Sequence, residues 1–163
     1  MSHFRQVLIK VELYTPFFYI NMEFDTETRI LGTPILLGVL GKHEQISKQN
    51  MYEKIIHPLI SAIGRLPDKL YVPSEGTSSA YMTLWAEKAN LEIQCVDADW
   101  RKLQRRAGIM RDARIQKEST HLLIFVGARS KTYEQTGIRE AKKGKQVYLV
   151  DHDTLDLCEL VVE

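Results

Sequence analysis

An α/β fold, with a Rossmann-like parallel sheet of about five strands and flanking helices, is predicted from three features of the chain. Short apolar runs alternate with amphipathic segments from residue 34 onward, an order typical of βαβ units. The apolar run at 121–126 ends in a glycine-containing loop, residues 127–132, which opens a helix. Alternation with a period of two is confined to residues 1–33 and indicates an N-terminal β-hairpin.

The expected hairpin consists of two amphipathic strands around the turn signal Tyr14-Thr15-Pro16. Apolar residues share one face of each strand: Val7, Ile9, Val11 and Leu13 in the first, and Phe18, Ile20, Met22 and Phe24 in the second. An amphipathic hairpin that the core does not need is a liability unless it is covered. We therefore expect a homodimer in which this extension serves association rather than ligand chemistry.

The remaining elements follow in order within one domain, which we divide into an extension (1–33), a core (34–151) and a C-terminal tail (152–163). Continuous apolar runs predict buried parallel strands, and helical spacing of apolar residues predicts the segments between them. The expected strands are 35–41, 70–72, 92–96, 121–126 and 146–151. The expected helices are 45–63 with Gly64 as its stop, one that follows 73–79, and one from Thr132 to 142–145.

Composition indicates a soluble globular protein rather than a membrane or nucleic-acid-coating protein. The 163 residues are 44% hydrophobic and 26% charged, with a net charge of +1. No apolar run approaches the roughly 20 residues of a membrane span, and the N-terminus lacks the apolar region of a signal peptide. Cys95 and Cys158 form no CxxC pair, which suits a reducing compartment. We expect a cytoplasmic protein.

A ligand site is predicted at the carboxyl edge of the sheet. Right-handed crossovers bring the loops after residues 41, 73, 97 and 127 to that edge. The loop 127–132 would present backbone N–H groups at a helix N-terminus, where an anion is favoured. Seven basic residues and a single acid lie between Arg101 and Lys117 and supply opposite charge, although a solvated helix face is the simpler interpretation of such a cluster.

The candidate ligand-binding residues combine glycines, hydroxyls and cations of these loops. They are Gly41, Lys42, Glu75, Gly76, Thr77, Arg111, Gly127, Arg129, Ser130, Lys131 and Thr132. The hydroxyls alternatively cap a helix in an ordinary turn. Arg111 and Arg114 could each present a guanidinium to a phosphate, and Arg111 is the expected counter-charge. Alternatively, one of the two pairs with Asp112 or Asp99 as scaffold, which is the outcome expected for Arg114. Glu75 would bind ribose hydroxyls or act as an acid, or it is simply solvent-exposed.

Other polar residues offer weaker alternatives. Trp100 either stacks on a base or closes the core, and His43 is a possible ligand contact. Acids near strand ends, Asp97, Asp99, Asp151 and Asp153 with His152, form a conceivable hard-cation site. No ligand spacing supports it, so we expect neither a metal nor a cofactor.

Several residues, mostly glycines and polar residues, occur in a distinctive order and spacing between about residues 35 and 151. They are Gly38 and Gly41, Glu75-Gly76-Thr77-Ser78-Ser79, Asp99-Trp100, Ala107-Gly108 with Arg111-Asp112, the loop 127–132, and Ala141 with Gly144-Lys145 and Val147. This pattern resembles the YspA-like branch of the SLOG superfamily of Rossmann-like nucleotide-ligand-binding domains. Relatives of that branch include the DNA-processing protein DprA and the LOG nucleotide phosphoribohydrolases. The resemblance implies binding of a nucleotide or a nucleotide-derived, phosphorylated or ADP-ribose-like ligand.

The chain departs from the phosphoribohydrolases at the residue that serves glycosidic cleavage. Aligned on Thr132, the position of their glutamate is Gln135, and an amide cannot stabilise a cation-like transition state with a charge. We therefore expect a binding protein that senses or sequesters its ligand. The alternatives are a nucleoside or nucleotide N-glycosidase or deoxyribosyltransferase-like enzyme, with Glu75 or Glu134 as the candidate catalytic residue, and a DprA-like DNA-associated protein. The modest net charge disfavours nucleic acid as a partner.

Overall fold

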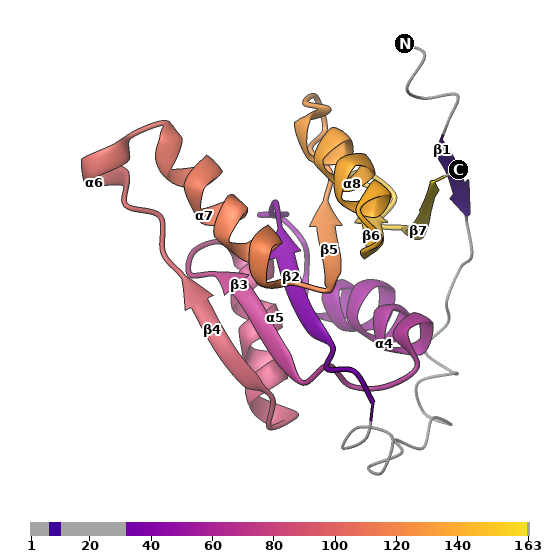
Figure 1. Ribbon diagram of the computed structural model, residues 1–163. Coiled ribbons are helices and arrows are strands. Elements are labelled where there is room, and N and C mark those ends of the chain that lie inside the picture. The colour runs from indigo at the N-terminus through magenta and orange to yellow at the C-terminus, as the bar shows by residue number, and fades with distance from the viewer. Residues whose placement is uncertain (1–6, 11–31, 163) are drawn as a thin grey trace.

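The computed structural model describes residues 7–10 and 32–162. Its strands form one sheet in the order β1-β7-β6-β5-β2-β3-β4 (Figure 1). Five neighbouring strands are parallel: β4 (Glu92–Val96), β3 (Lys69–Pro73), β2 (Leu36–Leu40), β5 (His121–Phe125) and β6 (Gln146–Val150). The predicted α/β fold with a parallel sheet of about five strands is confirmed.

Two antiparallel strands extend the sheet beyond β6. β7 (Leu157–Val162) pairs with β6, and β1 (Val7–Lys10) pairs with β7. The sequence analysis assigned residues 152–163 to a tail and did not predict β7, whose Leu157 and Leu160 are buried. β1 falls within the first expected strand of the hairpin, and the rest of that hairpin lies outside the described residues.

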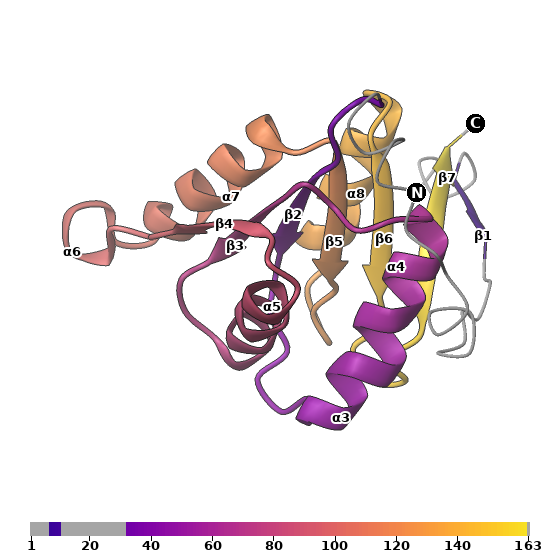
Figure 2. The ribbon, with the colours of Figure 1, turned by 90° about the horizontal axis from the view of Figure 1, so that it is seen from below.

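Helices cover both faces of the sheet and create two separate hydrophobic clusters (Figures 1 and 2). One face carries α5 (Thr77–Lys88) and a continuous helical segment of α3 (Lys48–Asn50), the π-helical η2 (Met51–Ile56) and α4 (His57–Ile63). The other carries α7 (Arg106–Glu118), which follows the short α6 (Trp100–Leu103), and α8 (Thr132–Lys142). Gly64 ends α4 in the left-handed conformation, with φ 95°, as predicted for a stop signal.

Two glycines of the β2 region allow unusually close packing. A Cβ at Gly38 would collide with Ser119 and Ile115 of the α7 end, and a Cβ at Gly41 would collide with the Phe125 carbonyl at the end of β5. Gly41 also has φ 72°, a conformation that side-chain-bearing residues rarely adopt. The carboxyl ends of β2 and β5 therefore lie against each other.

The adjacency of β2 and β5 defines the switch point of the sheet. From β2 the chain proceeds to β3 and β4 on one side, and it then crosses to β5 and β6 on the other. Loops that leave neighbouring strands in opposite directions open a crevice at the carboxyl edge, which is where α/β folds of this kind bind ligands. The carboxyl edge between β2 and β5 is thus the position at which this fold favours a ligand site.

The two helices of one face, α7 and α8, are tied together at their C-terminal ends by a buried carboxylate. Glu140 is 1% exposed and pairs with Lys143 (2.9 Å) and Lys145 (3.1 Å). Lys145 also donates a hydrogen bond to the carbonyl of Gln116 in α7. Burial alone would raise the pKa of Glu140, but the two lysines outweigh it and lower that pKa below its usual 4.5.

Glu140→Gln is expected to destabilise the fold at neutral pH by about 2 kcal/mol, the range for hydrogen bonds to charged groups. A carboxylate with a depressed pKa contributes stability above its unfolded pKa, and this contribution disappears as the pH falls through the folded pKa. The gap between variant and wild type should therefore shrink below about pH 4. Urea unfolding at pH 7 and pH 3.5 measures both, with the exposed Glu118→Gln as control. An equal gap at both pH values would contradict this role.

Candidate functional site

A cleft of about 500 Å³ lies at the switch point, between α7 and α8. The loops after β2 and β3 form its base, and the helices α6, α7 and α8 form its walls. Its lining residues are Gly41, Lys42, Pro73, Glu75, Trp100, Arg105, Gly108, Ile109, Arg111, Asp112, Gln116, Thr132, Tyr133, Thr136 and Arg139. The cleft has the size of sites that hold small molecules, which commonly measure about 300–1,000 Å³.

Five of the candidate residues from the sequence line this cleft: Gly41, Lys42, Glu75, Arg111 and Thr132. The other six are not among its lining residues: Gly76, Thr77, Gly127, Arg129, Ser130 and Lys131. Gly76 precedes the first turn of α5, with φ 104°. The structure thus brings the cationic and acidic candidates together more than the backbone candidates of the loop 127–132.

The loop 127–132 uses its hydroxyls on itself. The Ser130 hydroxyl accepts a hydrogen bond from the Thr132 backbone N–H (3.3 Å) and donates one to the Thr132 hydroxyl (3.0 Å). A Cβ at Gly127 would meet only ordinary contacts with Ser130, and Lys131 has φ −94°, so neither position requires glycine. This geometry matches the alternative of an ordinary turn that starts a helix.

A chain of hydrogen bonds joins the β3 loop to α6, α7 and α8. One oxygen of Glu75 accepts from both Trp100 Nε1 and Arg111 Nη1, each at 3.0 Å. Arg111 Nε also donates to Asp112 (3.3 Å), and the Tyr133 hydroxyl donates to the second oxygen of Asp112 (2.7 Å). These five side chains therefore hold the loop and three helices in one arrangement.

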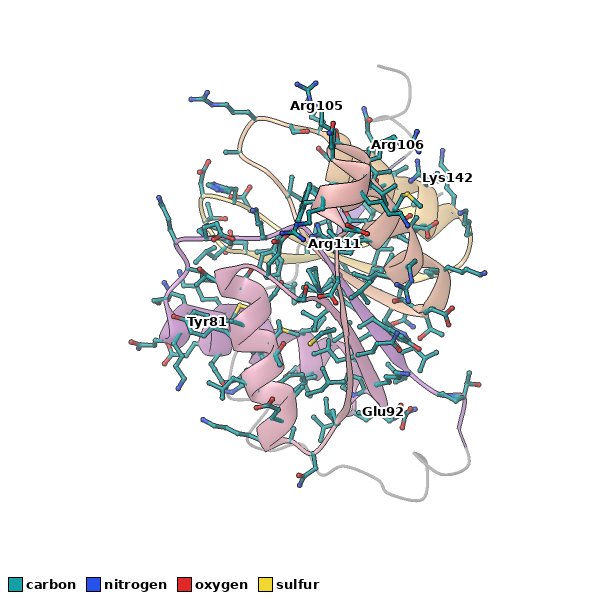
Figure 3. The ribbon with its side chains drawn as sticks, turned by 90° about the vertical axis from the view of Figure 1, so that its left-hand side faces the viewer. Tyr81, Glu92, Arg105, Arg106, Arg111 and Lys142 are labelled. Carbon is teal, nitrogen blue, oxygen red and sulfur yellow. The ribbon has the colours of Figure 1, made fainter. Side chains whose placement is uncertain are left out.

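The charge of Arg111 is balanced within the protein. The Arg111 side chain is 11% exposed and lies inside the fold. Arg105 and Arg106, by contrast, lie towards the outer edge of the molecule (Figure 3). Arg111 faces two carboxylates, Glu75 and the buried Asp112. It is thus Arg111, and not the exposed Arg114 as expected from the sequence, that pairs with Asp112.

Tyr133 serves this cluster as a neutral hydrogen-bond donor. Burial raises the pKa of its hydroxyl, and the neighbouring Asp112 carboxylate raises the pKa further. The opposing effect of Arg111 on that pKa is smaller. Tyr133 therefore stays protonated at neutral pH and fixes the orientation of Asp112.

Besides the selected Lys42, the cleft is lined by two cations, Arg105 and Arg139, that are not among the candidate residues chosen from the sequence. Arg105 and Arg139 are exposed, and their side chains form no hydrogen bond or ion pair with any residue in 7–10 or 32–162. Arg139 was detectable, because Thr132, Thr136 and Arg139 are spaced four and three residues apart on one helix face. Arg105 lies in the turn between α6 and α7, where no periodicity applies.

The Trp100 ring packs against α7 at Gly108. A Cβ at this position would lie 3.3 Å from the ring, so the absence of a side chain at Gly108 lets the indole lie close to the helix. Trp100 nevertheless remains 48% exposed at the cleft. Its ring therefore neither closes the core nor is covered, and its indole N–H is bonded to Glu75.

Two of the acids near strand ends, Asp99 and Asp151, serve local turns. Asp99 accepts a hydrogen bond from the Lys102 backbone N–H at the start of α6, and Asp151 accepts from the backbone of Asp153 and Thr154. His43 lies against His152, with ring centroids 4.6 Å apart. Within the described part of the chain, no three His, Cys, Asp or Glu side chains come together to hold a metal ion.

The first turn of α8 keeps two residues off the cleft lining: the candidate Glu134, and Gln135 at the position of the family's glutamate. Gln135 is exposed, Glu134 is half-buried, and neither is among the lining residues, whereas Thr132, Tyr133 and Thr136 are. Glu75 does line the cleft, but its carboxylate is engaged by Arg111. Both carboxylates among the described lining residues, Glu75 and Asp112, thus face Arg111.

Comparisons with protein-family models, curated proteins and solved structures give no match for this chain. The resemblance to the SLOG superfamily therefore remains a prediction. Among the described residues, no helix combines the length and apolar character needed to cross a membrane.

Arg111→Ala is expected to lower the free energy of unfolding by about 3 kcal/mol, because it leaves the buried Asp112 carboxylate with only Tyr133 as a partner. Urea unfolding measures the loss, with Arg114→Ala as the matched control expected to change it by less than about 0.5 kcal/mol. Adding Asp112→Asn to Arg111→Ala should recover part of the loss. Equal stability of Arg111→Ala and Arg114→Ala would show that the network is dispensable.

Proposed function

We propose that the chain binds a phosphorylated, nucleotide-type ligand in the cleft between α7 and α8, and that it senses or sequesters this ligand rather than cleaving it. The observation that carries the proposal is the coincidence of the cleft with the switch point of the sheet, together with Arg105 and Arg139 on its two walls. Arginine side chains suit phosphate because the planar guanidinium donates two parallel hydrogen bonds.

The proposed anion contacts come from side chains of opposite walls. Arg105 precedes α7 and Arg139 lies in α8, so a ligand that bridges them crosses the cleft. Lys42, from the loop after β2, adds a third cation. Its side chain is 63% exposed, and its ammonium group lies 4.0 Å from the Glu44 carboxylate, a long distance for an ion pair. Thr132 and Thr136 line the α8 side, and the Thr132 hydroxyl, which accepts from Ser130, keeps its own proton to donate. These donors match a phosphate group better than a neutral sugar or an apolar ligand.

Trp100 and Ile109 supply the other half of a nucleotide site. Both line the cleft and stay largely exposed, at 48% and 71%. An exposed aromatic ring beside a cationic group is the combination that holds a base and its phosphate together. The volume of about 500 Å³ accommodates a ligand of this size.

Binding without hydrolysis is supported by the state of the carboxylates. Glu75 and Asp112, the two acids that line the cleft, both accept hydrogen bonds from Arg111. Both are therefore paired before a ligand arrives, and Gln135 stands where the phosphoribohydrolases carry the glutamate that serves cleavage. Self-association, a cytoplasmic location and membership of the SLOG superfamily are further parts of the proposal that await their own tests.

Arg139→Ala and Arg105→Ala are each expected to weaken binding of a nucleoside 5′-monophosphate about 10- to 100-fold, the loss of one charge-assisted contact. Isothermal titration calorimetry with the four common 5′-monophosphates measures the affinities. The exposed Arg114→Ala removes the same charge from α7 outside the cleft and should change affinity less than about threefold. Absence of wild-type binding up to millimolar ligand, or equal losses for all three variants, would overturn the proposal.

A further inference from the structure

Glu75 differs from the other carboxylate on Arg111 in how firmly it is held. Asp112 is buried and is fixed by a second donor, the Tyr133 hydroxyl at 2.7 Å. Glu75 is 49% exposed, lies in the loop between β3 and α5, and has the half-exposed Trp100 as its other partner. Of the two acidic partners of Arg111, Glu75 is therefore the exchangeable one.

The Glu75 carboxylate lines the cleft that Arg105 and Arg139 also line. An anion bound in this cleft comes into the field of Glu75, and like charges repel strongly when partly removed from water. The repulsion is relieved if Glu75 leaves Arg111 and the incoming anion takes its position on the guanidinium. Because Trp100 Nε1 donates to the same Glu75 oxygen, this exchange also breaks the hydrogen bond of Trp100.

The charge of the competing group decides whether the exchange is favourable. A carboxylate carries one negative charge, whereas a terminal phosphate monoester carries about −1.5 to −2 at pH 7. A phosphate diester carries one charge and gains no electrostatic advantage over Glu75. A neutral nucleoside offers Arg111 no charge at all.

We infer that Glu75 is a specificity-determining residue, which occupies Arg111 as an internal anion and yields it to ligands with a terminal, dianionic phosphate monoester. This inference rests on the proposed function and narrows it, because diester-linked ligands of the ADP-ribose type are then disfavoured. Release of Trp100 from Glu75 accompanies binding and reports it.

The test uses the full chain and four probes: the tightest-binding nucleoside 5′-monophosphate, its 5′-phosphate methyl ester, the matching nucleoside, and inorganic phosphate. Calorimetry should give the monophosphate at least a tenfold higher affinity than its monoanionic methyl ester. Tryptophan emission should change with inorganic phosphate, which carries no base that could stack on Trp100, as well as with the monophosphate. Trp100→Phe should abolish the change, because the other tryptophan, Trp85, lies on α5 and is buried in the core.

Glu75→Gln is the decisive variant, because it keeps the shape of the side chain and removes the charge that must be displaced. We expect it to bind the monophosphate about three- to tenfold more tightly and to discriminate less against the methyl ester. Glu134→Gln removes one charge from the first turn of α8 without contacting Arg111, and it should stay within about twofold of wild type.

The outcomes separate this inference from the function on which it rests. Weaker binding by Glu75→Gln, or unchanged Trp100 emission in a protein that binds the monophosphate, overturns the exchange and leaves the proposed function standing. Equal affinity for the monophosphate and its methyl ester does the same. If neither wild type nor Glu75→Gln binds any probe, the proposed function and the inference fail together.

Discussion

The architecture of the cleft depends on how closely α7 approaches the sheet, and this approach depends on the missing side chain at Gly38. Ser119 and Ile115 occupy the space in which a Cβ at Gly38 would lie. α7 carries Arg111 and Asp112, and the turn before it carries Arg105. A helix displaced outward from β2 would separate these groups from Glu75 on the β3 loop and from Tyr133 on α8. One backbone contact thus sets the distances of the whole polar network.

Anion recognition in this fold relies more on side chains than on backbone N–H groups. The loop before α8 satisfies its own hydroxyls, and the Thr132 N–H is already bonded to Ser130. The cations of the cleft instead come from elements far apart in sequence, the loop after β2, the α6–α7 turn and α8. Long, exposed side chains lose conformational freedom when they hold a ligand. Such a site is less preorganised than one built from backbone N–H groups, but its side chains can adapt to the shape of the ligand.

The sequence predicted the parallel core because buried strands are continuous apolar runs, and their signal is local. Gly64 was recognisable as a helix stop for the same reason. β7 was missed because Leu157–Val162 is interrupted by Glu159 and follows an acidic turn, so only its pairing with β6 identifies it. The partners of Arg111 were likewise not readable: Glu75 is 36 residues distant, and the choice between Arg111 and Arg114 depends on the rotation of α7. Local pattern specifies elements, whereas side-chain partners depend on how the elements pack.

The lysine bridge between α8 and α7 has a mechanical consequence for the cleft. Glu140 and Lys145 join the C-terminal ends of the two walls at the Gln116 carbonyl, and Gln116 itself lines the cleft. The Tyr133–Asp112 hydrogen bond joins the same two helices a second time, in the first turn of α8. Any widening of the cleft is therefore smallest between these two attachments and largest near Trp100, where α6 extends beyond the edge of the sheet (Figure 2). The cleft thus has a fixed width at Gln116, and the position of Trp100 sets its width at the opposite end.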